Sequence, residues 1–127
     1  PELKWQAAKD STGITINITD ALQNWRKDSV GCRDMRITAM NDGLFKVVKL
    51  ANLSFEEVVQ LLGKPNRTRQ ELGWVIDKEE NVIVHTYYTG SDCYEKDGQS
   101  VVEPVSWLDV SILPRTNRVV DVAGAVR

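Results

Sequence analysis

The sequence is poor in the residues that most enzymes use for catalysis. It has one histidine, His85, and two cysteines, Cys32 and Cys93, in 127 residues. The cysteines lie 93 − 32 = 61 positions apart, which excludes a CxxC redox or zinc motif. The chain also lacks a P-loop, a G-x-G-x-x-G fingerprint, an H-E-x-x-H zinc motif and a G-x-S-x-G nucleophile elbow. We therefore expect no cofactor and no metal site.

Neither one sign of charge nor a long apolar run dominates the chain. Lysine and arginine number 16 against 18 aspartates and glutamates, a net charge of −2, so the chain lacks a basic footprint for nucleic acid. No apolar run approaches the roughly 20 residues that cross a bilayer. The first residue is Pro1 rather than methionine. Membrane association is therefore expected only through a lipid anchor on a missing N-terminal segment.

His85 lies between Val84 and Thr86 in an apolar stretch, which is typical of a histidine satisfied within a strand. A second interpretation pairs His85 with Cys93, eight positions on, as a thiol enzyme with Asp92 as loop acid. Three states of the cysteines remain open: a structural disulfide, two buried thiols, or this catalytic thiol. A disulfide would close a loop of 61 residues and stabilise the fold by about 4 kcal/mol.

Residues 53–66, L-S-F-E-E-V-V-Q-L-L-G-K-P-N, predict both ends of one helix. Ser54 and Glu57 have the spacing of a capping box, in which each side chain accepts a hydrogen bond from the other residue's backbone N–H. Apolar residues then recur at helical spacing. Gly63 suits a left-handed residue just past the helix end, and Pro65 prevents the helix from resuming. We expect a helix that turns directly into a strand.

The first residues are expected to be an extended lead-in. This segment covers residues 1–17 and is mostly polar. Ile14, Ile16 and Ile18 alternate with polar residues, a pattern that predicts a short edge strand.

Two helical segments are expected between the lead-in and residue 53. The first starts from a cap at Thr19 or Asp20, and the second covers the periodic apolar residues of 32–40. Residues 29–31 either separate the two segments or mark a bend in one helix. Residues 44–50 are apolar, and the run is too short for periodicity to decide between helix and strand.

After residue 65 the pattern changes to strands rich in β-branched and aromatic residues. Strands are expected over residues 67–76, 82–88, 105–113 and 118–122. Residues 77–81 and 114–117 are predicted hairpin turns, and residues 90–99, which include Cys93, a longer loop. The order of elements predicts a single α+β domain over residues 1–127, with N-terminal helices packed on one face of an antiparallel meander sheet of three to four strands.

The predicted helix, its L-G-K-P turn and the following strands resemble the small α+β modules of the SmpA/OmlA family. That family includes the outer-membrane lipoprotein of the β-barrel assembly machinery, and related folds include β-lactamase-inhibitor-like domains. The resemblance rests on residues 53–58, 61–66, 85–88 and 107–110. It implies an exported protein, periplasmic or outer-membrane-associated, that binds another protein.

A second, looser resemblance is to small secreted proteins and lipoproteins of Bacteroidetes-like bacteria, which carry a W-x-x-D-x-x-G-C-x-x-x-R segment. The corresponding residues here are Trp25, Asp28, Gly31, Cys32 and Arg36. This resemblance also implies export. In an oxidising compartment a Cys32–Cys93 disulfide is favoured over two thiols.

Aromatic residues are the candidates for a protein interface, because exposed aromatic side chains often anchor contacts. The candidates are Trp74, Tyr87, Tyr88 and Trp107. We expect them to alternate between core and surface, and the exposed members to be the contacts. Trp25 is expected in the core between helices and sheet, together with at least one of Trp74 and Trp107.

These observations predict a non-enzymatic, exported module that binds another protein through a face or an edge of its sheet. Two alternatives stay open. One is a small thiol-dependent hydrolase that uses Cys93 and His85, and a bridge from Cys32 to Cys93 would remove its nucleophile. The other is an inhibitor or immunity-type protein that blocks the active site of a partner.

Overall fold

The described part of the chain, residues 8–9 and 15–127 of the computed structural model, has a helical half followed by a β-sheet. A short ribbon of β1 (Ala8–Lys9) and β2 (Thr15–Ile16) comes first. The helices in these residues are α1 (Ile18–Lys27), α2 (Met35–Asn41), α3 (Leu44–Val47) and α4 (Phe55–Leu62). The strands that follow are β3 (Arg67–Val75), β4 (Lys78–Lys96), β5 (Gln99–Leu113) and β6 (Arg118–Val126).

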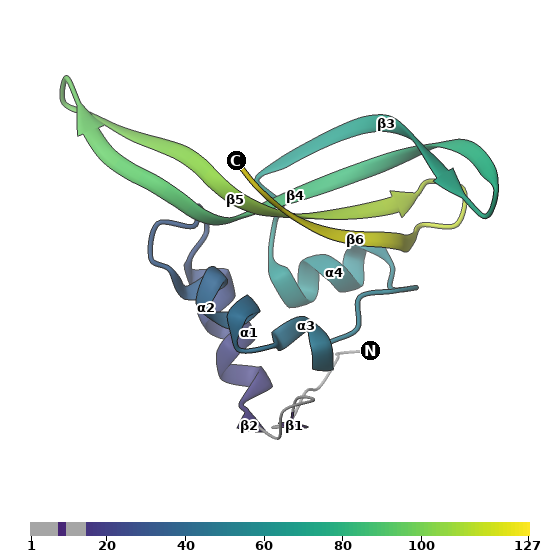
Figure 1. The fold of residues 1–127 in the computed structure, drawn as a ribbon, viewed down its shortest axis with the longest axis horizontal. Coiled ribbons are helices and arrows are strands. Elements are labelled where there is room, and N and C mark those ends of the chain that lie inside the picture. Colours follow the sequence, from purple (N-terminus) through teal and green to yellow (C-terminus); the bar gives the residue numbers. More distant parts are fainter. Residues whose placement is uncertain (1–7, 10–14) are drawn as a thin grey trace.

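The sheet is an antiparallel meander in the order β3-β4-β5-β6. The helices lie against one face of it (Figure 1). Both layers contribute to the core between them, which includes Leu22 and Trp25 of α1, Val58, Leu61 and Leu62 of α4, and Tyr87, Leu108, Val110 and Ile112 of the sheet. The expected fold class, α+β with N-terminal helices on one face of an antiparallel meander, is confirmed.

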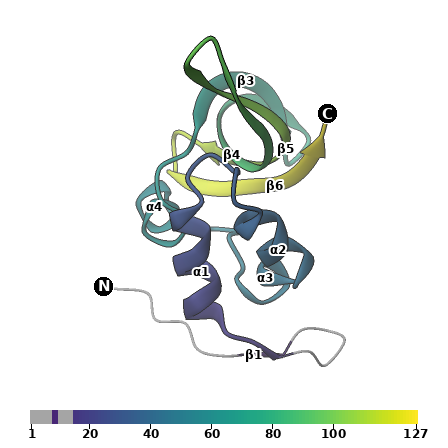
Figure 2. The ribbon, with the colours of Figure 1, turned by 90° about the vertical axis from the view of Figure 1, so that its left-hand side faces the viewer.

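The sheet curls, and β3 arches over the face that points away from the helices (Figure 2). A second, smaller apolar cluster of Val75, Val82, Val84 and Leu113 is buried there. Because side chains alternate between the two faces of a strand, Val82 and Val84 point away from Tyr87 and the main core. The centre of the sheet is therefore packed on both faces.

Helix α4 begins and ends where the sequence predicts. The Ser54 side chain accepts a hydrogen bond from the Glu57 N–H at 3.2 Å, and the Glu57 carboxylate accepts one from the Ser54 N–H at 3.0 Å, which confirms the capping box. Gly63 follows with φ 80° and ψ −168°, which is open to glycine although it is not the left-handed helical conformation. Pro65 lies in the turn that leads into β3.

Helix α1 begins earlier than the sequence predicts. Its cap is Asn17, whose side chain accepts a hydrogen bond from the Asp20 N–H at 3.1 Å, so neither Thr19 nor Asp20 is the cap. Ile18 is consequently the first helical residue and not part of an edge strand. Of the other expected strand residues, Ile16 is in β2 and Ile14 lies outside the described residues.

The remaining helical segments resolve the alternatives that the sequence left open. Helices α1 and α2 are separate, because Gly31 adopts φ 77° in the segment between them and cannot continue a helix. The apolar residues 44–50 divide into the short helix α3 and an extended segment after it. The last helical residue of α3 is Val47.

Strands β4 and β5 are longer than predicted, and residues 90–99 are not a loop. They continue the β4–β5 hairpin to a tight turn at Asp97 and Gly98, where φ is 52° and 77°. Two residues with positive φ suffice to reverse a hairpin. Strands are predicted from alternating apolar and polar residues. Both faces of these exposed strands carry polar side chains, so this alternation is absent and the sequence predicts a loop. Residues 91–104, here called the arm, extend beyond the helices (Figure 1).

The other two hairpin turns agree with the sequence to different degrees. Residues 114–117 connect β5 to β6 as predicted. The turn predicted over residues 77–81 is shorter, because Ile76 and Asp77 form it and β4 already begins at Lys78. At the other end, β6 continues past the predicted residue 122 to Val126.

A buried arginine joins the helices to the sheet. Arg36 of α2 is only 1% exposed. Its Nε donates to the Trp25 carbonyl at 2.9 Å, and its Nη1 donates to the Tyr88 carbonyl at 3.0 Å and to Asn66 Oδ1 at 3.1 Å. The guanidinium also lies 5.1 Å from the centroid of the Trp25 ring, within cation–π range. One side chain thus connects α1, α2, β4 and the turn before β3.

Asp28 supports this junction at the start of α2. Its carboxylate, 1% exposed, accepts hydrogen bonds from the backbone N–H groups of Arg33, Met35 and Arg36 at 3.0, 3.0 and 3.3 Å. Asp34 occupies the cap position but makes no side-chain cap bond, so Asp28 caps α2 from outside the helix. Burial lowers the pKa of Arg36, and the charge of Asp28 opposes that shift. The guanidinium remains charged.

The two cysteines form a disulfide beside this junction. Cys32 and Cys93 are bonded, with their Cα atoms 5.9 Å apart, so the expected disulfide is confirmed. Next to it, the Ser91 N–H donates to the Gly31 carbonyl at 3.0 Å. The bond fastens the base of the arm to the segment between α1 and α2. A structural disulfide indicates an oxidising, exported location.

Replacing Arg36 by methionine should lower the free energy of unfolding by about 3 kcal/mol, because buried carbonyls and the Asp28 charge lose their partner. Urea denaturation followed by circular dichroism measures this change. Arg33→Met is the matched control: Arg33 is exposed, and its replacement should change the free energy of unfolding by less than about 0.5 kcal/mol. Equal effects of the two substitutions would contradict the role assigned to Arg36.

Reducing the Cys32–Cys93 bond should lower the free energy of unfolding by about 4 kcal/mol, because the bond closes a loop of 61 residues in the unfolded chain. Urea titrations with and without a phosphine reductant measure the difference. The double variant Cys32→Ser, Cys93→Ser is the control and should not respond to the reductant. Alkylation of both thiols in unreduced protein, detected by intact mass, would show that the bond is absent.

Candidate functional site

Large apolar side chains are exposed on the hairpin of β3 and β4. Leu72, Trp74 and Ile76 are 63%, 76% and 92% exposed. They occupy alternate positions, so Leu72 and Trp74 project from the same face of β3 and Ile76 follows at the turn. We call these three residues the apolar row. Exposed apolar patches, especially ones rimmed by polar residues, mark interaction sites.

Leu72 and Trp74 belong to the sheet face that packs on the helices at the centre of the sheet, but β3 curls away from the helical layer (Figure 2). Thr68 is opposite His85 in the strand register and is hydrogen-bonded to its ring at 2.9 Å. Phe55 of α4 stacks on the same ring, so Thr68 points toward α4. Leu72 and Trp74 lie an even number of residues further along β3 and share that face. The hairpin extends past α4, which leaves the row uncovered (Figure 1).

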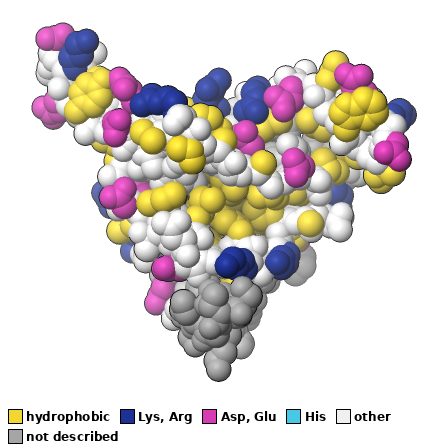
Figure 3. All heavy atoms as spheres, in the orientation of Figure 1, with side chains coloured by type: hydrophobic (Ala, Val, Ile, Leu, Met, Phe, Trp, Pro, Cys, Tyr) yellow, Lys and Arg dark blue, Asp and Glu magenta, His cyan; other side chains and the backbone are white. Residues whose placement is uncertain are grey.

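Charged side chains and a hollow border the apolar row. Glu80 of β4 and Arg115 of the β5–β6 turn form an ion pair at 3.1 Å, and this bond lowers the pKa of Glu80. A hollow of about 380 Å³ lies between this pair and Leu72, with Pro114 in its wall. Hydrophobic, acidic and basic side chains occur together at the end of the molecule that carries the β3–β4 hairpin, at the upper right of Figure 3. An apolar centre with a polar rim is the usual composition of a protein-binding surface.

Ile76 has a backbone conformation that is unfavourable for its side chain. Ile76 and Asp77 form the β3–β4 turn with φ 49° and 60°, the pattern of a type I′ turn. Glycine and asparagine adopt positive φ readily, whereas a β-branched residue is strained there. Because the side chain is 92% exposed, burial within the fold does not offset this strain. Ile76 therefore serves neither the turn nor the core.

The structure corrects one of the four aromatic interface candidates. Tyr87 is fully buried: its hydroxyl donates to the Gly63 carbonyl at 2.8 Å, and its ring centroid lies 6.3 Å from that of Trp25. Burial raises the pKa of this hydroxyl. Tyr87 is thus a core residue, because the odd-numbered positions of β4 point toward the helices. Trp74, by contrast, is exposed as a contact residue should be.

Tyr88 and Trp107 lie opposite each other in the register, on the face away from the helices, and both are half-buried. The structure therefore separates them from Trp74, which lies on the other face. Neither Trp74 nor Trp107 is in the core between helices and sheet, so that expectation is wrong. Trp25 fills this core as predicted and is 0% exposed, with Phe45 packed edge-on against it at 5.3 Å.

His85 and Cys93 do not form a catalytic pair. They lie eight residues apart on β4, about 25 Å along a strand, and the Cys93 sulfur is in the disulfide. The buried His85 ring stacks on Phe55 with centroids 4.2 Å apart and is hydrogen-bonded to Thr68. Burial lowers the pKa of His85. The hydrolase alternative thus loses its nucleophile, and His85 is the satisfied strand histidine.

Leu72 and Ile76 belong to the candidate site but are not among the residues that the sequence predicts for it. The signal was present as the alternation L-x-W-x-I over residues 72–76. Alternation shows that these side chains share a face, but it does not show whether another layer covers that face. Coverage depends on how far α4 reaches along the sheet, which is a property of the tertiary structure.

Within residues 8–9 and 15–127, no three histidine, cysteine, aspartate or glutamate side chains gather into a metal-binding group. The helices of these residues also lack the length and apolarity that spanning a bilayer requires. The resemblance to the SmpA/OmlA family stays a prediction. Comparison of the chain with family models, curated proteins and solved structures gives no significant match.

Proposed function

We propose that the chain is a non-enzymatic module that binds another protein through the apolar row. The observation that carries this proposal is the exposure of Leu72, Trp74 and Ile76, which belong to neither apolar cluster of the fold. Burying these side chains against a partner would stabilise the complex by about 25 cal/mol for each Å² of apolar surface removed from water. Tryptophan is prominent among the residues that dominate binding energy, so Trp74 is the anchor of this interface.

The module acts in the periplasm or at the outer membrane. The Cys32–Cys93 disulfide supports an oxidising compartment. The resemblance of residues 53–66 to the SmpA/OmlA family supports placement at the outer membrane, with a lipid anchor on the N-terminal side. The same resemblance supports another protein as the ligand.

The charged residues around the apolar row indicate what kind of partner surface would bind there. Glu79 lies opposite Trp74 in the register, and the Glu80–Arg115 pair lies beside Leu72. The partner therefore carries an apolar pocket for Trp74 with hydrogen-bond donors around it, because complementary charge at the rim fixes orientation. An inhibitor that covers an active site would be one form of such a module.

A photo-crosslinking amino acid at position 74 tests the proposal in cells that produce the protein with its natural leader. We expect one covalent adduct, whose partner is identified by mass spectrometry. The same amino acid at position 102 of the arm, where Val102 is 37% exposed, is the control. Adducts at both positions with the same proteins, or none at position 74, would count against the apolar row as the binding site.

Trp74→Lys should weaken binding of the identified partner by about 30-fold or more, because it removes the apolar anchor, while leaving the free energy of unfolding within about 0.5 kcal/mol of its original value. Isothermal titration calorimetry and urea denaturation measure the two effects. Val102→Lys should change neither. A loss of stability equal to the loss of binding would mean that Trp74 serves the fold instead.

Ile76→Asn should raise the free energy of unfolding by about 1 kcal/mol, because asparagine tolerates the positive φ that strains isoleucine. The same variant should bind the partner more weakly, since it loses an apolar contact. Thermal unfolding and calorimetry measure the pair of effects. Asp77→Asn is the control at the neighbouring turn position, where both residues tolerate positive φ. A lower free energy of unfolding for Ile76→Asn would show that isoleucine is not strained at this position.

A further inference from the structure

The two edge strands of the sheet differ in how they are protected from pairing with other strands. On β3 the exposed residues Arg67, Arg69 and Glu71 carry charges, a device that discourages edge-to-edge pairing. On β6, residues 122–126 read V-A-G-A-V and contain neither charge nor proline. Residues 122–126 of β6 are therefore an edge segment without charge or proline; on β3 the charges cover residues 67–71, and the following residues 72–76 lack them.

The register shows which groups β6 presents at this edge. The Arg127 N–H donates to the Val105 carbonyl at 2.7 Å. Directly opposite residues in an antiparallel pair alternate between hydrogen-bonded and non-hydrogen-bonded pairs. Ala125 and Ala123 therefore bond to β5, whereas Val122, Gly124 and Val126 direct their N–H and C=O groups outward.

A short pairing begins at this edge and then stops. The Asn52 N–H donates to the Val119 carbonyl at 3.0 Å, and the Val119 N–H donates to the Leu53 carbonyl at 2.9 Å. Further along β6, no described group is hydrogen-bonded to the outward backbone of residues 122–126. An added strand would continue the pairing that residues 52–53 begin.

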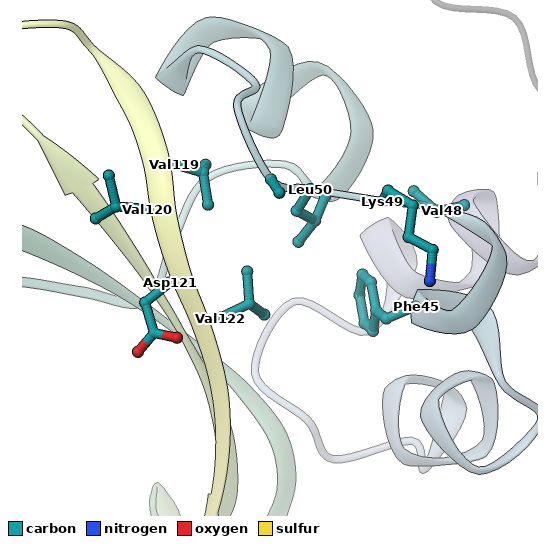
Figure 4. Close-up of a pocket in the computed structure, with 9 residues that line it drawn as sticks. Phe45, Val48, Lys49, Leu50, Val119, Val120, Asp121 and Val122 are labelled. Atoms are coloured by element: carbon teal, nitrogen blue, oxygen red, sulfur yellow. The ribbon is translucent and has the colours of Figure 1, made fainter. Parts of the chain in front are cut away.

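An apolar groove of about 320 Å³ lies directly beside this edge. Phe45, Val48 and Leu50 line it on the side of the helices, and Val119 and Val122 point into it from β6 (Figure 4). On the same face of β6, Val122 is 36% and Val126 is 76% exposed. A strand placed along the edge would put every second side chain over the groove.

We propose that the occupant of this edge is a second copy of the chain, with the two β6 strands paired antiparallel about a two-fold axis through Gly124. Because V-A-G-A-V reads the same in both directions, this register sets valine opposite valine, alanine opposite alanine and glycine opposite glycine. It brings Val126 of the second copy beside Val122, at the groove. The outward N–H and C=O groups of residues 122, 124 and 126 are satisfied in both copies.

This contact uses residues 122–126 of β6, none of which is in the apolar row, and it does not depend on the proposed function. It joins two four-stranded sheets into one of eight strands. Paired strands of this length and two symmetric groove contacts form an interface at or below the low end of the usual size range, so the dimer dissociates on dilution. Sedimentation velocity over micromolar to millimolar protein should show a monomer that converts to a dimer.

The variant Gly124→Pro removes an outward N–H without touching the hydrogen bonds between β6 and β5. Gly124 does not have positive φ, so the backbone there is open to other residues. We expect this variant to stay monomeric at every concentration while keeping the circular dichroism spectrum of the original protein. Val102→Pro on the arm is a control that should leave the dimer intact.

A cysteine at position 124 tests the register directly. In the proposed pair the two Gly124 Cα atoms are about 5.5 Å apart, within the range of about 4.4–6.8 Å that a disulfide spans. A Cβ at Gly124 meets only the end of the Met40 side chain, at 3.8 Å, so the substitution is tolerated. Gly124→Cys should form a covalent dimer in oxidised glutathione, with the Cys32–Cys93 bond intact by peptide mapping.

Val122→Cys is the matched control for the cross-link. In this register Val122 faces Val126 of the second copy, so two cysteines at position 122 lie roughly 13 Å apart and should not bond to each other. Equal cross-linking of both variants would overturn the register. A monomer at all concentrations with no cross-link from position 124 would overturn the dimer and leave the edge to a strand of a different protein.

Discussion

The guanidinium of Arg36 ties the helical layer to the sheet through backbone carbonyls on both sides, that of Trp25 in α1 and that of Tyr88 in β4. Asp28 holds the first residues of α2 in place, so the position of Arg36 depends on a carboxylate eight residues earlier in the chain. A buried cation without these partners would be costly, which makes the junction specific for one arrangement of the layers.

The disulfide extends this junction to the arm. Gly31 packs so closely on β4 that a Cβ would lie 3.1 Å from the Tyr88 carbonyl and 3.2 Å from the Gly90 nitrogen. That approach brings Cys32 to Cys93 at the base of the arm. The residues of the W-x-x-D-x-x-G-C-x-x-x-R segment therefore act together, because Trp25, Asp28, Gly31, Cys32 and Arg36 all dock the helices on the sheet. This shared structural role explains their spacing without catalysis.

The strands are long relative to the helices that cover them. β4 has 19 residues and β5 has 15, whereas α4 has 8. The sheet consequently extends past the helical layer, as the arm at one end and as the hairpin with the apolar row at the other (Figure 1). Surfaces that the core does not need are free to contact other molecules. The proposed function uses one of these extensions, the hairpin that carries the apolar row.

Local sequence determined the elements whose signals are complete within a few residues. The capping box of Ser54 and Glu57, the helix end at Gly63 and the change to strands after Pro65 all depend on short-range hydrogen bonds and backbone preference. The α+β class follows from the order of these elements. The spacing of two cysteines does not show whether they are bonded. The disulfide could be predicted only together with the oxidising compartment that the resemblance implies.

Tertiary structure decided the features that depend on distant residues. Asp28 caps α2 from outside that helix, residues 90–99 are strand because each arm strand pairs with the other, and Tyr87 is buried while Trp74 is exposed because α4 ends before the hairpin tip. Alternation assigns side chains to two faces but does not show what covers each face. Both the apolar row and the open edge of β6 could be recognised only once the layers were in place.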